Sequence, residues 1–246
     1  GHAWPRRGPN RKTARIRYLM QRFASETITY SEAHKKELMV KYPKLRILSA
    51  PNALYSQSEM GGLELSMDEA KNIIYVGRLV AAKKPLFLVK AFHKLLDLDT
   101  NLIIVGDGPE RKKIDEYVET HNLGLRVQLT GHINNFNKLK ELYAKSLVSV
   151  SPGYVGLSIT QSFAFGVPML ISRNEDHSPE IEAAKESSNA VFFQTDNQND
   201  FCLKVEEIFK SKKVFFEKRN IIADLCKKHY TVEQMAISFV QILRDN

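Results

Sequence analysis

The chain has 246 residues, of which 43% are hydrophobic, so it is long enough to bury one sizeable core and part of a second. Lys and Arg residues (36) outnumber Asp and Glu residues (28), and the resulting charge of +8 favours a polyanionic partner such as a nucleotide diphosphate, a nucleic acid or an anionic membrane. No apolar run is long enough to span a bilayer, and two cysteines without metal-ligand spacing indicate reduced thiols in a cytoplasmic protein.

The first 67 residues predict short, separate elements. Because the chain begins at Gly1 rather than Met, and no signal peptide precedes the first element, we expect a fragment or a processed form. Residues 6–22 are basic without an acidic residue, and apolar side chains recur at helical spacing from residue 14 (Ile16, Met20, Phe23). Such a helix either lies on an anionic membrane surface or packs its apolar side into the fold.

Two short strands are then expected at residues 26–30 and 45–48. Between them lies a helix that Ser31 caps and that reaches residue 41. Residues 55–67 contain Ser and Gly and predict an exposed linker. We therefore place a domain boundary in this linker.

Beyond the linker, apolar strands alternate with helices. The strands are predicted at residues 72–76, 102–105, 127–129, 147–150, 168–171 and 190–193, and the helices at 85–98, 109–121, 136–144, 157–165 and 179–186. This alternation predicts an α/β fold, a Rossmann-like doubly wound parallel sheet whose ligand lies beyond the carboxyl ends of the strands. Helices at 200–210, 214–228 and 232–244 have no strands between them, so we expect them to pack outside the sheet.

The loop between the strand at 147–150 and the helix at 157–165 is the first candidate site. Pro152, Gly153 and Gly156 interrupt the apolar pattern there. Free backbone N–H groups and the positive end of a helix dipole would meet at this loop, which suits an anion. The alternative is a tight turn without a ligand, which is usual for a glycine loop considered alone.

Other polar residues follow neighbouring strands. Arg78 and Lys83 come after the strand at 72–76 and are placed to meet phosphate oxygens, unless they are simply solvated. The turn at 106–111 lacks the third glycine of a dinucleotide fingerprint and follows the second strand, which argues against NAD. After the third strand, Gly131 and His132 present backbone that could hydrogen-bond a nucleobase edge.

Acidic residues near the sheet carry different expectations. Asp97 and Asp99 formally make a metal-binding pair, but they lie between a helix and a strand on the opposite edge from the site. We expect them to be solvated and expect no metal. Glu180 follows the fifth strand, and its carboxylate either caps the next helix or reaches the ligand.

As a set, these motifs resemble the glycosyltransferases of the GT-B fold, family 4, which are retaining enzymes that use a nucleotide diphosphate sugar. The resemblance lies in residues 75–79 with Lys83, 105–110, 129–131 and 156–168, and weakly in 28–31 and 50–53. It implies three parts. These are a remnant of the N-terminal acceptor-side domain with the crossover (1–60), a C-terminal nucleotide-sugar-binding domain (66–230) and a bracing C-terminal helix (231–246).

The resemblance also implies roles for single residues. Arg78 and Lys83 would neutralise the leaving diphosphate and stabilise the transition state, so that neither a cofactor nor a metal ion is needed. Gly131 and His132 would border the base. The full set of donor-binding residues implied by the resemblance is Gly77, Gly131, His132, Gly153, Tyr154, Gly156, Leu157, Ser158, Ile159, Gln161 and Glu180.

One departure from the family concerns two glutamates that typically stand eight positions apart in this loop. This chain has Gly153 and Gln161 at those places. Gln161 can accept one hydrogen bond from a ribose hydroxyl, whereas Gly153 offers no side chain. Either Tyr154, His177 or Glu180 contacts the sugar, or the donor preference has changed, or the activity is lost. The phosphate-binding residues favour a working member of a variant subgroup.

The resemblance therefore predicts a hexosyltransferase that moves a sugar, with retention, from a UDP- or GDP-sugar to a saccharide or lipid-linked acceptor. Its expected context is cell-surface polysaccharide or glycoconjugate synthesis in the cytoplasm, with peripheral contact at the inner face of the membrane. A whole GT-B enzyme needs two full domains, so we expect this chain alone to bind nucleotide and to transfer sugar poorly. Alternatives are a degenerate nucleotide-sugar-binding module and a nucleotide-sugar epimerase. A nucleic-acid-binding protein is disfavoured because no recognition motif accompanies the charge.

Overall fold

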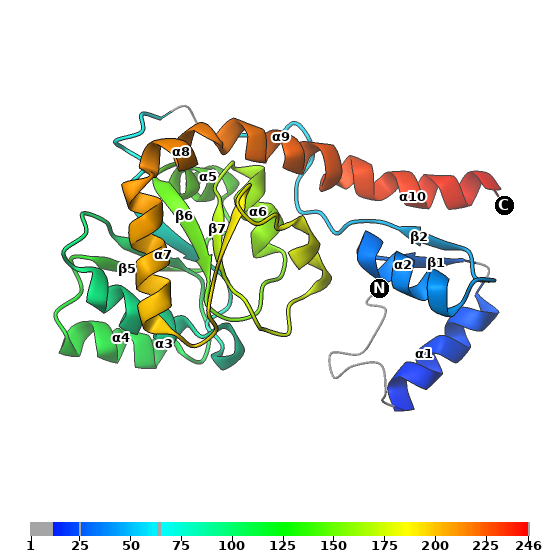
Figure 1. Cartoon of the computed structure of the whole chain (residues 1–246), viewed down its shortest axis with the longest axis horizontal. Helices are drawn as coiled ribbons and strands as arrows, with labels where there is room; N and C mark the ends of the chain where they lie inside the picture. Colours follow the sequence, from blue (N-terminus) through cyan, green and yellow to red (C-terminus); the bar gives the residue numbers. More distant parts are fainter. Residues whose placement is uncertain (1–11, 25, 63–64, 246) are drawn as a thin grey trace.

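The computed structural model describes residues 12–24, 26–62 and 65–245. A small N-terminal part lies beside a larger α/β part (Figure 1). It contains α1 (Lys12–Phe23), β1 (Thr27–Thr29), α2 (Glu32–Lys41) and β2 (Ile47–Ser49), and its two strands pair in parallel. The side chain of Ser31 accepts a hydrogen bond from the His34 backbone N–H, which confirms the predicted cap of α2.

The larger part is built on one six-stranded parallel sheet with strand order β5-β4-β3-β6-β7-β8. Its strands are β3 (Asn72–Val76), β4 (Leu102–Val105), β5 (Val127–Gly131), β6 (Ser146–Ser151), β7 (Met169–Ser172) and β8 (Ala190–Phe193). The predicted doubly wound α/β fold is thus confirmed. The direction of winding changes between the central strands β3 and β6, where such sheets bind ligands.

Helices cover both faces of this sheet because successive strand residues point to opposite sides. Ile73 and Tyr75 of β3 are buried against α3 (Pro85–Phe92), α4 (Arg111–Thr120) and α7 (Gln198–Lys210). Ile74 lies on the other face with α5 (Phe136–Ala144). On that same face, α6 (Ser158–Ala164) packs against β7 and α9 (Arg219–His229).

Three predicted helices differ from the observed ones. The helix expected at 85–98 ends at Phe92 and continues as the 3₁₀ helix η2 (His93–Leu95). The one expected at 179–186 is the 3₁₀ helix η3 (Pro179–Ala183), with i to i+3 hydrogen bonds after Ser178. The segment at 214–228 divides into α8 (Lys212–Glu217) and α9. Arg219, at the start of α9, donates hydrogen bonds to the last carbonyls of α5, and this packing decides where the segment turns.

The linker at 55–67 lacks regular structure in its described residues but is not exposed throughout, which corrects the prediction. Met60 is buried in the same cluster as Val155, and the Gly61 backbone N–H donates to the Ala164 carbonyl at 2.8 Å. The linker is therefore packed onto α6. The domain boundary placed there stays a prediction.

The last helix, α10 (Val232–Asp245), extends from the larger part over the smaller one (Figure 1). The Ser238 hydroxyl donates to the Ser49 carbonyl at 2.5 Å, and the Val232 backbone N–H donates to the Tyr55 carbonyl at 3.0 Å. These contacts fix α10 against both the end of β2 and the linker.

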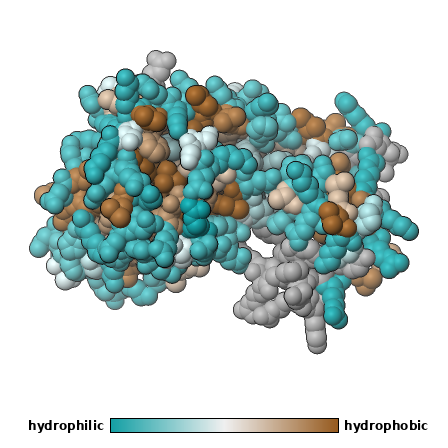
Figure 2. Space-filling model, in the orientation of Figure 1, coloured by the Kyte–Doolittle hydropathy of each residue, from teal (hydrophilic) through white to brown (hydrophobic). Residues whose placement is uncertain are grey.

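The apolar residues of α1 are exposed rather than packed. Ile16, Met20 and Phe23 are 59%, 68% and 82% exposed, so the expectation that this side packs into the fold is not met in the described structure. In the orientation of Figure 1, hydrophobic residues are visible on the surface of both parts of the molecule (Figure 2). Residues 6–11 of the basic segment lie outside the described residues. In the described ranges, every helix is too short or too polar to cross a membrane.

Candidate functional site

A cavity of about 370 Å³ lies beyond the carboxyl ends of β3, β4 and β5. Four of the predicted site residues meet there, namely Gly77, Arg78, His132 and Gln161. Gln161 comes from α6 on the other side of the switch point, so the cavity spans the place where the winding changes. The remaining lining residues are Val76, Val105, Gly106, Asp107, Ile133 and Leu139.

The floor of this cavity requires close approach of the backbone. Gly106 has φ +146°, and a Cβ atom there would stand 1.9 Å from the Gly77 carbonyl oxygen. Only glycine fits such a position. The Gly106 N–H donates to the Gly131 carbonyl at 2.9 Å, and the Gly77 N–H donates to the Val105 carbonyl at 3.0 Å, so the ends of β3, β4 and β5 are tied together.

Lys83 lies between this cavity and the glycine loop. Its Nζ atom donates a hydrogen bond to the Tyr154 carbonyl at 3.2 Å and stands 4.1 Å from the centroid of the Tyr154 ring. A Cβ atom on Gly77 would be 3.4 Å from Lys83 Cδ, so the lysine stem passes beside the cavity floor. The structure thus brings Lys83 to the turn before Leu157, whereas Arg78 lines the cavity next to Gly77. Arg78 is exposed, and its carbonyl accepts a hydrogen bond from the buried Tyr75 hydroxyl at 3.0 Å.

Gly153 is in direct backbone contact with the segment that carries Lys83. A Cβ atom at this position would stand 2.3 Å from the Ala82 carbonyl oxygen and 2.7 Å from Lys83 Cα. The next residue, Tyr154, donates its N–H to the same Ala82 carbonyl at 3.4 Å. Because the side chain is absent at 153, the 3₁₀ turn η1 (Ala81–Lys83) approaches the loop closely and sets the position of Lys83.

The neighbouring lysine has a different partner set. Lys84 adopts a left-handed backbone conformation with φ 51°, and its Nζ atom lies 2.6 Å from Glu175 and 2.7 Å from Asp196. Its ammonium is therefore held by the carboxylates of Glu175 and Asp196, which lie outside the glycine loop. Of these two adjacent lysines, Lys83 is the one that contacts the glycine loop.

Two tyrosines that the sequence did not indicate hold Gln161. The Gln161 amide nitrogen donates to the Tyr55 hydroxyl at 2.7 Å, and the Tyr143 hydroxyl donates to the amide oxygen at 3.3 Å. Burial raises the pKa of both tyrosines, so both stay neutral. Tyr55 belongs to the predicted linker and Tyr143 to the buried side of a helix, so neither position carried a signal for a site.

The backbone amides of the glycine loop are partly free. Within the described part of the chain, the N–H groups of Gly156, Leu157 and Ser158 donate no hydrogen bond, whereas the Ile159 N–H donates to the Gly156 carbonyl at 3.1 Å. Helix α6 begins at Ser158. The amides that remain available to an anion are thus those of residues 156–158, and Ile159 is no longer one of them.

Glu180 lies away from this cavity and does not cap a helix. The residue is 6% exposed, and its Oε1 atom accepts a hydrogen bond from the Asn52 amide at 3.0 Å. Its Oε2 atom has no partner among the described residues. The side chain faces a second cavity of about 390 Å³ between the two parts of the molecule, also lined by Ser49 and Tyr230.

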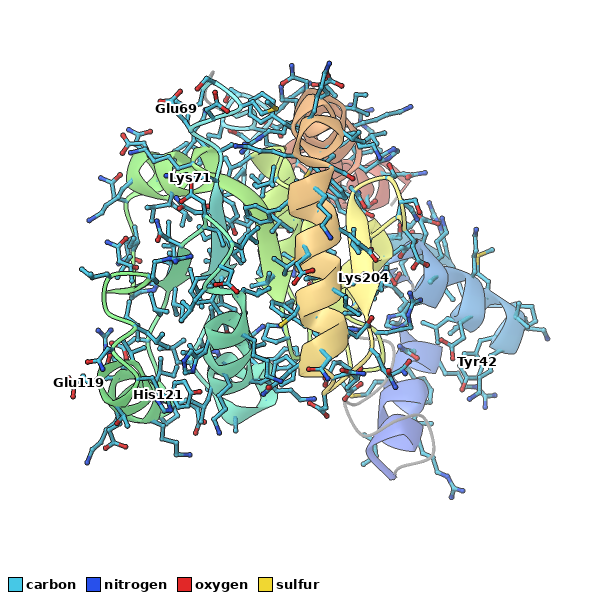
Figure 3. The ribbon with its side chains drawn as sticks, turned by 60° about the vertical axis from the view of Figure 1, so that its left-hand side comes forward. Tyr42, Glu69, Lys71, Glu119, His121 and Lys204 are labelled. Atoms are coloured by element: carbon cyan, nitrogen blue, oxygen red, sulfur yellow. The ribbon has the colours of Figure 1, made fainter. Side chains whose placement is uncertain are left out.

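The acidic pair ahead of β4 lies at the other end of the sheet. Asp97 and Asp99 are exposed, and the Asp99 carboxylate is 3.8 Å from Lys71 Nζ, which stands where β3 begins (Figure 3). Within the described ranges, no group of three or more His, Cys, Asp or Glu side chains is placed to hold a metal ion.

Comparison with known proteins links this geometry to a family. Residues 64–228 match the family model described as glycosyl transferases group 1. Over 111 residues, the chain is 32% identical to an uncharacterised glycosyltransferase of Methanocaldococcus jannaschii, an alignment that covers 43% of this chain and 28% of that protein.

Solved structures show the same fold. Sucrose-phosphate synthase from Thermosynechococcus elongatus superposes with a TM-score of 0.76 at 19% identity, over 96% of this chain and 62% of that chain. Anabaena HepE, solved in complex with UDP and glucose, gives a TM-score of 0.76 at 15% identity, over 100% of this chain and 71% of that one. The chain therefore spans less than a third of the curated relative and about two thirds of these structural neighbours.

Proposed function

This chain belongs to the glycosyl transferases group 1 family, and from that premise we propose that it binds a nucleotide diphosphate sugar for transfer of a hexose-type sugar. The proposed donor is a UDP- or GDP-sugar, the acceptor a saccharide or a lipid-linked saccharide, and the reaction proceeds with retention as in family 4. The observation that supports the proposal is the hydrogen bond that holds Lys83 against the glycine loop, whose N–H groups at residues 156–158 donate no hydrogen bond within the described residues. Arg78 lines the cavity at the carboxyl ends of the neighbouring strands.

The chemistry follows from charge development on the donor. When the bond between the anomeric carbon and the diphosphate breaks, its electron pair passes to a phosphate oxygen. Lys83 is partly buried and held in place by the Tyr154 carbonyl, so its ammonium needs little reorganisation to meet that oxygen. Preorganised donors of this kind stabilise the transition state more than the ground state. The exposed Arg78 guanidinium would bind the remaining phosphate oxygens.

The nucleoside half of the donor would occupy the cavity beside Gly131 and His132. Gln161, at the other side of the cavity, would meet the ribose hydroxyls. Anabaena HepE, which shares the fold, was solved with UDP and glucose, and this supports a nucleotide-sugar ligand. Glu180 faces the other cavity, so we assign it no direct contact with the diphosphate.

A membrane-bound acceptor would suit the surface charge. The chain carries a net charge of +8, and α1 combines Arg15 and Arg22 with exposed Ile16, Met20 and Phe23. A basic helix with exposed apolar side chains binds the surface of anionic membranes. We therefore propose peripheral contact at the cytoplasmic face of the membrane.

Titration with UDP and with GDP by calorimetry tests the assignment. We expect saturable binding of at least one of the two, and much weaker binding of the matching nucleoside, because the proposed contacts are to the diphosphate. If neither nucleotide binds at millimolar concentration while Arg78 is intact, the proposed function is wrong.

Gln161→Glu is expected to tighten binding of UDP or GDP about three- to tenfold. A carboxylate accepts hydrogen bonds from ribose hydroxyls more strongly than an amide, and Tyr143 and Tyr55 are placed to donate to it. The matched control is the 2′,3′-dideoxy form of the same nucleotide, whose affinity should stay unchanged. Equal effects on both nucleotides would show that Gln161 does not meet the ribose.

A further inference from the structure

His177 lies in the loop between β7 and η3, and both of its ring nitrogens are bound to backbone groups. Nδ1 accepts a hydrogen bond from the Val155 N–H at 3.0 Å, and Nε2 donates one to the Ser172 carbonyl at 2.9 Å. An amide N–H only donates and a carbonyl only accepts, so the ring is neutral with its proton on Nε2. The imidazole thus joins the end of β7 to the glycine loop and has no nitrogen left for a sugar.

Val155 is the centre of the glycine loop, and both of its backbone polar groups are paired with the His177 segment. Besides the contact to Nδ1, its carbonyl accepts the Ser178 N–H at 3.0 Å, and its side chain is fully buried. On the other side of the loop, Tyr154 contacts Ala82 and Lys83. The loop that presents the amides of residues 156–158 is therefore held between Lys83 on one side and His177 on the other.

The loop that carries His177 is itself fixed. Glu175 accepts hydrogen bonds from the Ser172 hydroxyl at 3.1 Å and from Lys84 Nζ at 2.6 Å. The charged groups that face the imidazole are Glu175 and Asp176 on its own loop, with Lys84 paired to Glu175. The ring is consequently supported by a loop that is tied to β7 and to the segment following Lys83.

We propose that His177 is a positioning residue that holds the glycine loop in its diphosphate-binding conformation only while its imidazole is neutral. This inference rests on the proposed function insofar as the loop binds the donor. Protonation would place a hydrogen on Nδ1 opposite the Val155 N–H, so two donors would face each other and the contact would be lost. At acidic pH, the glycine loop would then lose its hydrogen bond to His177.

The direction of the pH effect follows from burial. Desolvation lowers the pKa of His177 below its ordinary value of 6.5, while hydrogen bonding to Ser172 and the nearby Glu175 act in the opposite direction. A lowered pKa means that the fold favours the neutral ring. The stabilisation is therefore complete above pH 6.5 and is lost as the pH falls through the lowered pKa.

Three variants separate the two hydrogen bonds. His177→Asn places an amide oxygen near the position of Nδ1, so it keeps an acceptor for Val155 and cannot be protonated at neutral or mildly acidic pH. His177→Gln places an amide nitrogen near Nε2, which keeps the donor to Ser172 but leaves the Val155 N–H unpaired. His177→Phe removes both contacts. Thermal unfolding of each variant shows whether it is folded.

The first measurement is hydrogen exchange of the Val155 amide by NMR between pH 5 and pH 8, corrected for the intrinsic pH dependence. We expect protection in the wild-type protein to fall about tenfold or more toward pH 5. The Asn variant should keep its protection over this range, and the Gln and Phe variants should be weakly protected throughout. A wild-type pH dependence in the Asn variant, or full protection in the Gln variant, would overturn the positioning role.

The second measurement is the Kd for UDP over the same range. Phosphate itself titrates near pH 6, so each value is compared with the Asn variant, which cancels that contribution. We expect the Gln variant to bind UDP about tenfold more weakly than the wild type at pH 7.5. As the pH falls, the wild-type protein should lose additional UDP affinity that the Asn variant retains. Absence of UDP binding by the wild-type protein would overturn the donor role, whereas the exchange experiment would still decide whether His177 holds the loop.

Discussion

Replacing Lys83 with alanine is expected to lower the rate of sugar transfer by the full-length protein about 10²- to 10³-fold, as removal of one preorganised oxyanion donor does in other enzymes. The ammonium is placed by its hydrogen bond to the Tyr154 carbonyl at 3.2 Å and stands 4.1 Å from the centroid of the Tyr154 ring. Lys84 cannot substitute because Glu175 and Asp196 hold it. Arg78→Ala should act in the same direction, with a smaller effect because Arg78 is exposed.

Turnover of a nucleotide sugar, together with the Kd for UDP and for uridine, tests this prediction. Lys83→Ala should lower turnover strongly and weaken the binding of UDP about tenfold or more. The binding of uridine, which has no phosphate, should not change. Lys90→Ala is the matched control because Lys90 is an exposed lysine on α3, outside the site. If Lys83→Ala weakens uridine as much as UDP, or leaves turnover intact, Lys83 does not act on the diphosphate.

Gly153→Glu is expected to destabilise the protein by about 1–3 kcal/mol and to abolish UDP binding rather than improve it. The resemblance to family 4 suggests the opposite result, namely improved UDP binding, because the family typically has a glutamate at this position. In this chain, however, a Cβ atom at 153 would stand 2.3 Å from the Ala82 carbonyl and 2.7 Å from Lys83 Cα. The backbone that carries Lys83 must move to admit any side chain.

Denaturant unfolding and UDP titration of Gly153→Glu decide between these outcomes. Gly124→Glu is the control, because a Cβ atom at Gly124 has no neighbour within 4 Å. It should be close to wild type in both measurements. A Gly153→Glu protein with unchanged stability and tighter UDP binding would show that η1 yields easily, and that the missing carboxylate alone distinguishes this chain from typical members.

The local sequence pattern was enough to predict most of the strands and helices of the larger part. The strands near 72–76, 102–105 and 190–193 are continuous apolar runs between helices, and each is found within a residue of its predicted bounds. The 3₁₀ helix at Pro179 was missed because its periodicity over a few residues is the same as that of an α-helix start. The break at Lys218 was missed because it depends on Arg219 bonding to α5, a contact between distant segments.

The sequence by itself determined the doubly wound sheet, the glycine loop and the end of the sheet at which Arg78 and Lys83 stand, namely the carboxyl ends of the strands. It could do so because apolar periodicity and turn residues act over a few neighbouring positions. Only the tertiary structure decided which lysine meets the loop, that Gln161 lies between two tyrosines, that Glu180 faces another cavity, and that His177 binds Val155. These contacts join residues that are 18 to 128 positions apart. Their geometry depends on the packing of whole elements, and no local pattern encodes it.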